Sequence, residues 1–114
     1  MPLPEFVRTQ AEAAIAEYCL QMIPRRYWNK LRVSYELRRG AFTIFEDRPR
    51  FDNPAEWTHL AVAQLRFDST TGTWSLFWRD RHERWHPCTG IRRPKTVAPL
   101  LAEVDRDPTG IFWG

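Results

Sequence analysis

Residues 31–48 read LRVSYELRRGAFTIFEDR and predict a β-hairpin. Apolar and polar side chains alternate on both sides of Arg39-Gly40, which is the two-residue period of a half-buried strand. Arg39-Gly40 itself predicts a two-residue turn. Folding about that turn places Leu37 opposite Phe42 on one face of the hairpin. The further pairs that it predicts are Tyr35 with Ile44, Glu36 with Thr43, Ser34 with Phe45, and Arg32 with Asp47.

The segments on either side of this hairpin predict two helices and further strands. In residues 4–23 apolar side chains recur at steps of three and four, as on one face of an amphipathic helix, and Pro24 ends it. Residues 97–104 predict a second, short helix. The remaining strands are expected at 57–67, at 73–79 and in a brief stretch ending at Pro87, with Trp85 opposite Trp78. Connected as a meander, they predict an α+β fold, in which an antiparallel sheet of four or five strands is covered on one face by the N-terminal and C-terminal helices.

Length and composition limit the class of protein. With 114 residues, 43% of them apolar, the chain is long enough for one modest core, so we expect a single domain over residues 1–114 and no separate cofactor lobe. No stretch approaches the roughly 18 apolar residues of a membrane span, and no basic start followed by an apolar run indicates a signal peptide. We therefore expect a cytoplasmic protein with no membrane partner and no cofactor. Two distant cysteines, Cys19 and Cys88, predict reduced thiols.

Several stretches resemble a bacterial family, domain of unknown function 3024. They are Phe45-Glu46-Asp47-Arg48-Pro49-Arg50, Glu56-Trp57, Ala63-Gln64-Leu65-Arg66-Phe67, Trp74-Ser75-Leu76-Phe77-Trp78, Arg84-Trp85-His86, and the ending from Leu101 to Gly114. The resemblance covers nearly the whole chain and implies a small bacterial cytosolic protein. The family has no established activity, so the resemblance assigns no role to any residue.

One short motif invites a catalytic interpretation. His82-Glu83-Arg84-Trp85-His86 matches HExxH, in which a helix brings two histidines four residues apart to one zinc ion. Pro87 disfavours a helix at His86, and the alternation before it predicts a strand, on which residues four apart are separated by about 13 Å. We therefore predict a polar turn here, with no catalytic or metal-binding residues, and keep a zinc-dependent hydrolase as the third alternative for function.

Positive charge is concentrated on one predicted face of the sheet. Of the 17 basic residues 15 are arginine, which binds phosphate and carboxylate in a planar, bidentate way. The face toward the helices should hold the aromatic core, made of Tyr35, Phe42, Phe67, Trp74, Trp78 and Trp85. The opposite face should carry the candidate binding residues Arg66, Arg79, Arg84, Phe45 and Phe77, with Leu60 and Val62 among them. Loops at one end of the sheet should add the further candidates Arg25, Arg26, Arg48 and Arg50.

Two hypotheses for function follow from this surface. Arginines among exposed rings suit an anionic ligand or a single-stranded nucleic acid, and the predicted pairing of Arg79 with Arg84 needs a negative partner. We therefore favour a non-catalytic binding module. The alternative is a homodimer or partner-binding protein that uses the same face and the C-terminal tail with Phe112 and Trp113, although that tail is more often packed on its own domain. A simpler interpretation assigns this surface no ligand. In it, Glu36, Glu83 or a terminal segment neutralises the positive charge of the face.

Overall fold

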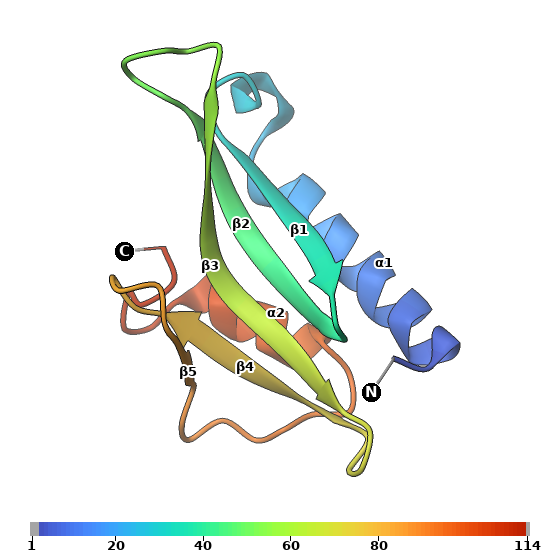
Figure 1. Cartoon of the computed structure of the whole chain (residues 1–114). Coiled ribbons are helices and arrows are strands. Elements are labelled where there is room, and N and C mark those ends of the chain that lie inside the picture. Colours follow the sequence, from blue (N-terminus) through green and yellow to red (C-terminus); the bar gives the residue numbers. More distant parts are fainter. Residues whose placement is uncertain (1–2, 114) are drawn as a thin grey trace.

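The hairpin predicted from residues 31–48 is present in the computed structural model, which describes residues 3–113 (Figure 1). Strands β1 (Arg32–Arg38) and β2 (Ala41–Pro49) are antiparallel, and all five predicted pairs are confirmed. Arg39 and Gly40 between them have φ values of 52° and 77°. Positive φ at both central residues is the mark of a type I′ turn, whose twist matches that of the two strands.

The remaining elements complete the predicted α+β architecture. They are α1 (Glu5–Met22), a 3-10 turn η1 (Arg25–Tyr27), β3 (Trp57–Asp68), β4 (Thr73–Arg79), β5 (Trp85–Pro87) and α2 (Ala98–Arg106). The five strands form one antiparallel sheet in the order β1-β2-β3-β4-β5, so the predicted meander is confirmed. Figure 1 shows both helices on the same side of the sheet, which leaves the other side open.

The core lies between the sheet and the two helices. Ile15 of α1 and Val104 of α2 are fully buried against Phe42 and Trp74 of the sheet. Burying a side chain of this size contributes about 1.5–3 kcal/mol, so this layer is the main source of stability. Cys19 is buried in the same layer, where burial raises the pKa of its thiol to about 12, as expected for an unreactive cysteine.

The register of β5 differs from the prediction. Trp85 pairs with Arg79, and His86 pairs with Trp78, because the turn between β4 and β5 holds residues 81–83 and is one residue longer than the predicted Arg81-His82 turn. A shift of one residue moves every side chain of a strand to the other face. The predicted core position of Trp85 is therefore wrong, as is the predicted pair of Arg79 with Arg84.

A β-bulge in β3 accounts for a second difference. Ile44 pairs with Ala63 whereas Phe45 pairs with Ala61, so Val62 has no partner on β2. Because the bulge adds one residue to β3, the side chains of residues 57–61 point to the opposite faces from those that a regular alternation predicts. As a result Val62 is buried in the core and only 4% exposed, and Leu60 also faces the helix side of the sheet. The prediction that these two apolar side chains lie among the arginines is wrong.

The C-terminal tail packs on its own domain. Phe112 is 8% exposed within the core, and the indole Nε1 of Trp113 donates to the carbonyl of Val104 at 3.0 Å. The carboxylate of Asp107 accepts the backbone N–H groups of Phe112 and Trp113 at 3.0 and 2.9 Å. Within residues 3–113 no helix has the length and apolar character needed to cross a membrane.

Candidate functional site

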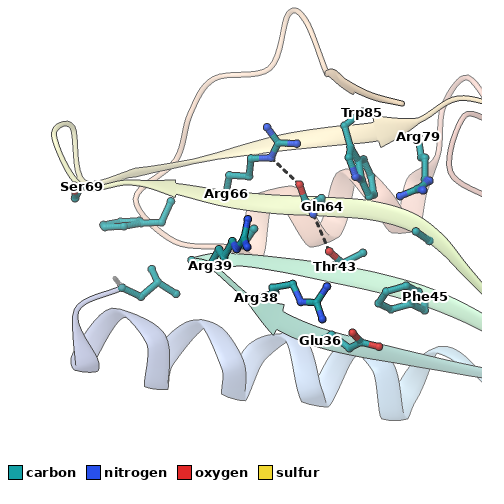
Figure 2. A pocket seen from close by; sticks show the side chains of 15 residues that line it. Glu36, Arg38, Arg39, Thr43, Phe45, Gln64, Arg66, Ser69, Arg79 and Trp85 are labelled. Atoms are coloured by element: carbon teal, nitrogen blue, oxygen red, sulfur yellow. Dashed lines mark hydrogen bonds between the residues drawn. The ribbon is translucent and has the colours of Figure 1, made fainter. Parts of the chain in front are cut away.

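The open face of the sheet contains a hollow of about 510 Å³ with a strongly positive lining (Figure 2). Four guanidinium groups line it, together with a single carboxylate, that of Glu36. The four arginines are Arg38, Arg39, Arg66 and Arg79, and we call this site the arginine hollow. Of its positive charges, two come from the end of the β1–β2 hairpin and two from the strands β3 and β4.

Arg66 occupies the middle of the hollow and is held from two directions. Its Cζ lies 3.7 Å from the centre of the Phe77 ring, and its Nε donates to the side-chain oxygen of Gln64 at 2.6 Å. Gln64 in turn donates to the hydroxyl of Thr43 at 2.8 Å. The two hydrogen bonds drawn in Figure 2 therefore link Arg66 on β3 to Thr43 on β2. These contacts use the face and the Nε of the guanidinium and leave its two terminal nitrogens for a ligand. Partial burial also lowers the pKa of Arg66.

Arg79 and Trp85 form the second stacked pair of the hollow. The Cζ of Arg79 lies 5.1 Å from the Trp85 ring centre, close enough for a cation–π contact. One carboxylate oxygen of Glu83 lies 4.0 Å from the guanidinium, and Glu83 is largely exposed. An exposed ion pair at that distance is weak, so Arg79 keeps most of its capacity to bind an anion.

Arg38 and Arg39 close the hollow at the hairpin turn. In the described part of the chain, the arginines that form ion pairs are Arg8, Arg48, Arg50, Arg79 and Arg106. Arg38, Arg39 and Arg66 are not among them. Arg39 also adopts a left-handed conformation at φ 52°, which costs a residue other than glycine about 1 kcal/mol or more. Strain of this kind concentrates at functional positions.

A histidine with two carboxylates lies beside the hollow. The ring of His59 stacks on Phe45 with centres 3.6 Å apart, and its Nε2 lies 2.7 Å from an oxygen of Glu36. Its Nδ1 bonds to Asp47, which also accepts the hydroxyl of Ser34 at 2.6 Å. Burial opposes the charged form of His59, but the bonds to Asp47 and Glu36 outweigh it and raise its pKa. Both bonds thus favour the protonated form of the ring, the form that offsets the two carboxylates.

The structure brings together most of the candidates on the predicted face. Arg66, Arg79 and Phe45 line the hollow, and Phe77 supports Arg66. Arg84 does not join them, because it lies in the turn before β5, where its backbone N–H donates to Asp80 at 3.0 Å.

The loop candidates lie away from the hollow. Arg25 stacks on Trp28 and Arg26 on Tyr27, both in and after η1. Arg48 pairs with Glu46 at 2.9 Å, and Arg50 pairs with Asp52 and Glu56 at 2.7 and 3.2 Å. Loop charge at Arg48 and Arg50 is thus balanced locally.

The HExxH segment does not form the helix that zinc binding through this motif requires. Glu83 has a φ of 63° in the turn, and His86 lies in β5. The ring of His86 is engaged by Asp80, with Nε2 2.6 Å from the carboxylate, and stacks on Trp78 on the helix side of the sheet. Among residues 3–113 no three His, Cys, Asp or Glu side chains are arranged to hold a metal ion.

Comparison with known families bears on the family resemblance that was seen in the sequence. A family model described as a domain of unknown function, DUF3024, matches residues 3–114. The chain belongs to the DUF3024 family. No curated protein and no solved structure matches it. Membership in DUF3024 confirms the resemblance seen in the sequence and carries no activity with it, so the argument for function rests on the geometry of the hollow.

Three residues of the hollow were missed as binding candidates. The alternation in residues 31–38 already places Arg38 on the same face as Glu36, so the sequence carried that signal. The sequence assigns Arg39 only to the turn, although a long basic side chain is unusual where type I′ turns favour Asn, Asp or Gly. Trp85 was assigned to the core, and only the length of the turn before β5 shows its true face.

Proposed function

We propose that this DUF3024 protein is a binding module that holds an anionic ligand in the arginine hollow. The observation that supports it most directly is the state of Arg66. Its guanidinium is fixed by Phe77 and Gln64, and none of the described carboxylates forms an ion pair with it. A fixed guanidinium loses little conformational entropy on binding and presents its two terminal nitrogens as a bidentate donor.

The charge balance of the hollow favours the same ligand class. Four guanidinium groups face one carboxylate, and that carboxylate, Glu36, is already bonded to His59. Bringing an anion between the guanidinium groups removes their mutual repulsion. It also offsets the partial burial that lowers the pKa of Arg66. Phosphate and carboxylate groups are the anions whose geometry fits a planar guanidinium.

The alternative of a partner-binding protein uses side chains that have other contacts in this structure. Phe112 is buried in the core, and Trp113 bonds to the carbonyl of Val104. Phe77, the apolar group at the centre of the proposed dimer face, is covered by Arg66 at 3.7 Å. These contacts are the reason for preferring the binding of an anion.

Calorimetric titration with sodium tripolyphosphate tests the proposal. We expect saturable binding that weakens as sodium chloride is added, because ion release dominates such contacts. Arg66→Ala should weaken binding about tenfold or more, since a charge-assisted hydrogen bond contributes about 1.5–3 kcal/mol. Arg66→Lys should recover only part of it, because lysine lacks the planar fork.

Arg106→Ala is the matched control. Arg106 is an exposed arginine of α2, paired with Glu103 on the other side of the sheet, and its loss should leave the affinity unchanged. Equal affinities for Arg66→Ala and Arg106→Ala, or no measurable binding by the parent protein, would refute the hollow as an anion site.

A further inference from the structure

We propose that the anionic ligand is a single-stranded nucleic acid, which lies along β3 from the arginine hollow to the loop that joins β2 and β3. This inference rests on the proposed function and extends it, because an isolated phosphate would need only the hollow. The open face continues beyond the hollow with further flat, positively charged groups.

Three stacked pairs of a cation and a ring follow one another along β3. Arg66 lies over Phe77 at 3.7 Å near one end of the strand, and His59, which follows Trp57 by two residues, stacks on Phe45 at 3.6 Å. At the other end Trp57 lies under Arg32, with the Cζ of Arg32 4.4 Å from the ring centre. We call this row the β3 track. Its three β3 residues are Arg66, His59 and Trp57, which the bulge at Val62 keeps on the same face.

The length of the β3 track favours a chain of nucleotides over a small anion. Trp57 and Arg66 are separated by most of β3, and at about 3.3 Å per residue they lie roughly 30 Å apart. Folds that bind single strands cover about four nucleotides or more. A mononucleotide or an inorganic phosphate could occupy one of the three pairs, whereas a short oligonucleotide can contact all of them.

The chemistry of the track matches the parts of a nucleotide. Unpaired bases stack on histidine rings and on guanidinium planes as well as on aromatic rings, and phosphates bind arginine. Arg66, His59 and Arg32 each cover a ring and so present a flat, cationic outer face. In a duplex the bases are stacked on each other, so these flat faces select a single strand.

The far end of the track carries exposed rings and further positive charge. Phe51, in the loop between β2 and β3, is fully exposed, and Trp57 is 36% exposed. The Nε of Arg32 donates to the carbonyl of Trp28 at 2.7 Å, so the segment after η1 lies against this end of the track. The turn η1, which directly precedes Trp28, adds Arg25 and Arg26, both stacked on rings. A strand leaving the track would meet more cations and rings here.

Two carboxylates also face the track and must be accommodated. Asp47 bonds to His59 and to the hydroxyl of Ser34, and Glu36 bonds to the other nitrogen of His59. The His59 ring therefore lies between them, and both bonds favour its protonated form. Against these two groups the face carries Arg32, Arg38, Arg39, Arg66 and Arg79, so the track remains positive.

Fluorescence anisotropy with labelled oligothymidylates dT2, dT4, dT6 and dT8 tests the inference. Affinity should rise with length until the track is filled, and a duplex of the longest sequence should bind more weakly. Trp57→Ala removes the ring that supports Arg32. It should weaken dT6 and dT8 about tenfold, the value of one stacking position, and leave dT2 unchanged. Arg66→Ala should weaken every length.

Phe6→Ala is the matched control for Trp57→Ala, since Phe6 is an exposed ring on α1, far from the open face. Urea unfolding of both variants checks that they remain folded. If dT2 and tripolyphosphate bind as well as dT8, the hollow is a site for a small anion, and the track is refuted while the proposed function stands. If Arg66→Ala leaves every probe unaffected, the proposed function itself fails.

Discussion

In the proposed function, Arg39 serves binding at the expense of stability. It lies in the left-handed region with φ 52°, in a turn that favours glycine, and its guanidinium lines the hollow. We expect Arg39→Gly to raise the free energy of unfolding by up to about 1 kcal/mol, because glycine adopts this conformation without strain. The same change removes one of four cations and should weaken the binding of tripolyphosphate. Urea titration and calorimetry measure the two effects.

Glu83 provides the matched control for Arg39. It too has a positive φ, of 63°, but it lies in the turn before β5 and outside the lining of the hollow. Glu83→Gly should therefore raise stability by a similar amount without weakening anion binding, because it removes a carboxylate that lies 4.0 Å from Arg79. Parallel effects of the two variants on affinity would show that the charge of Arg39 is not used.

At the scale of the elements, Asp80 sets the geometry of the turn between β4 and β5. Its carboxylate accepts the backbone N–H groups of His82 and Arg84 at 2.8 and 3.0 Å and contacts Nε2 of His86 at 2.6 Å. The bond to His86, followed by that to the Arg84 N–H, lowers the pKa of Asp80 to about 2. A depressed carboxyl pKa stabilises the fold above the unfolded value of 3.8, and this contribution is lost as the pH falls toward about 2.

The variant Asp80→Ala tests this role. It should lower the urea midpoint at neutral pH and flatten the fall in stability between about pH 4 and pH 2. Amide hydrogen exchange should become faster in β5 and remain slow in the β1–β2 hairpin, because only the short strand depends on the turn. Asp52→Ala, which removes an exposed partner of Arg50 in the loop between β2 and β3, is the control and should keep the exchange of β5 slow. A β5 that remains equally protected without Asp80 would contradict the role.

The strands also show which parts of the fold can be predicted from the sequence and which cannot. The β1–β2 register was predictable because a two-residue turn and the dyad pattern on both sides independently require it. At β5 the turn is set by the side-chain bonds of Asp80 and by the left-handed Glu83, which the local pattern does not reveal. The β3 bulge at Val62 is likewise set by packing across strands, since the apolar residues before it fit either face. Each of these two errors moved side chains across the sheet and so altered the predicted site.

At the scale of the whole molecule, the proposed function places binding on the face of the sheet opposite the core. The helix side holds the core, to which the C-terminal tail adds Phe112 at 8% exposure. The open side holds the arginine hollow, whose charged side chains are not buried. The two sides share the strands but not the side chains, because alternate residues of a strand point to opposite faces. Changes on one side should therefore affect one property.

Phe112→Ala tests this separation. Truncation of a buried phenylalanine removes about 3 kcal/mol or more of stability, so the urea midpoint should fall markedly. At a temperature where the variant is still folded, its affinity for tripolyphosphate should equal that of the parent protein. Ile111→Ala, next to it and 38% exposed, should change stability much less. Light scattering of both variants tests the other role of the tail. A change of oligomeric state with Phe112→Ala at unchanged stability would mean that the tail joins two copies, and the division between a stabilising face and a binding face would then be wrong.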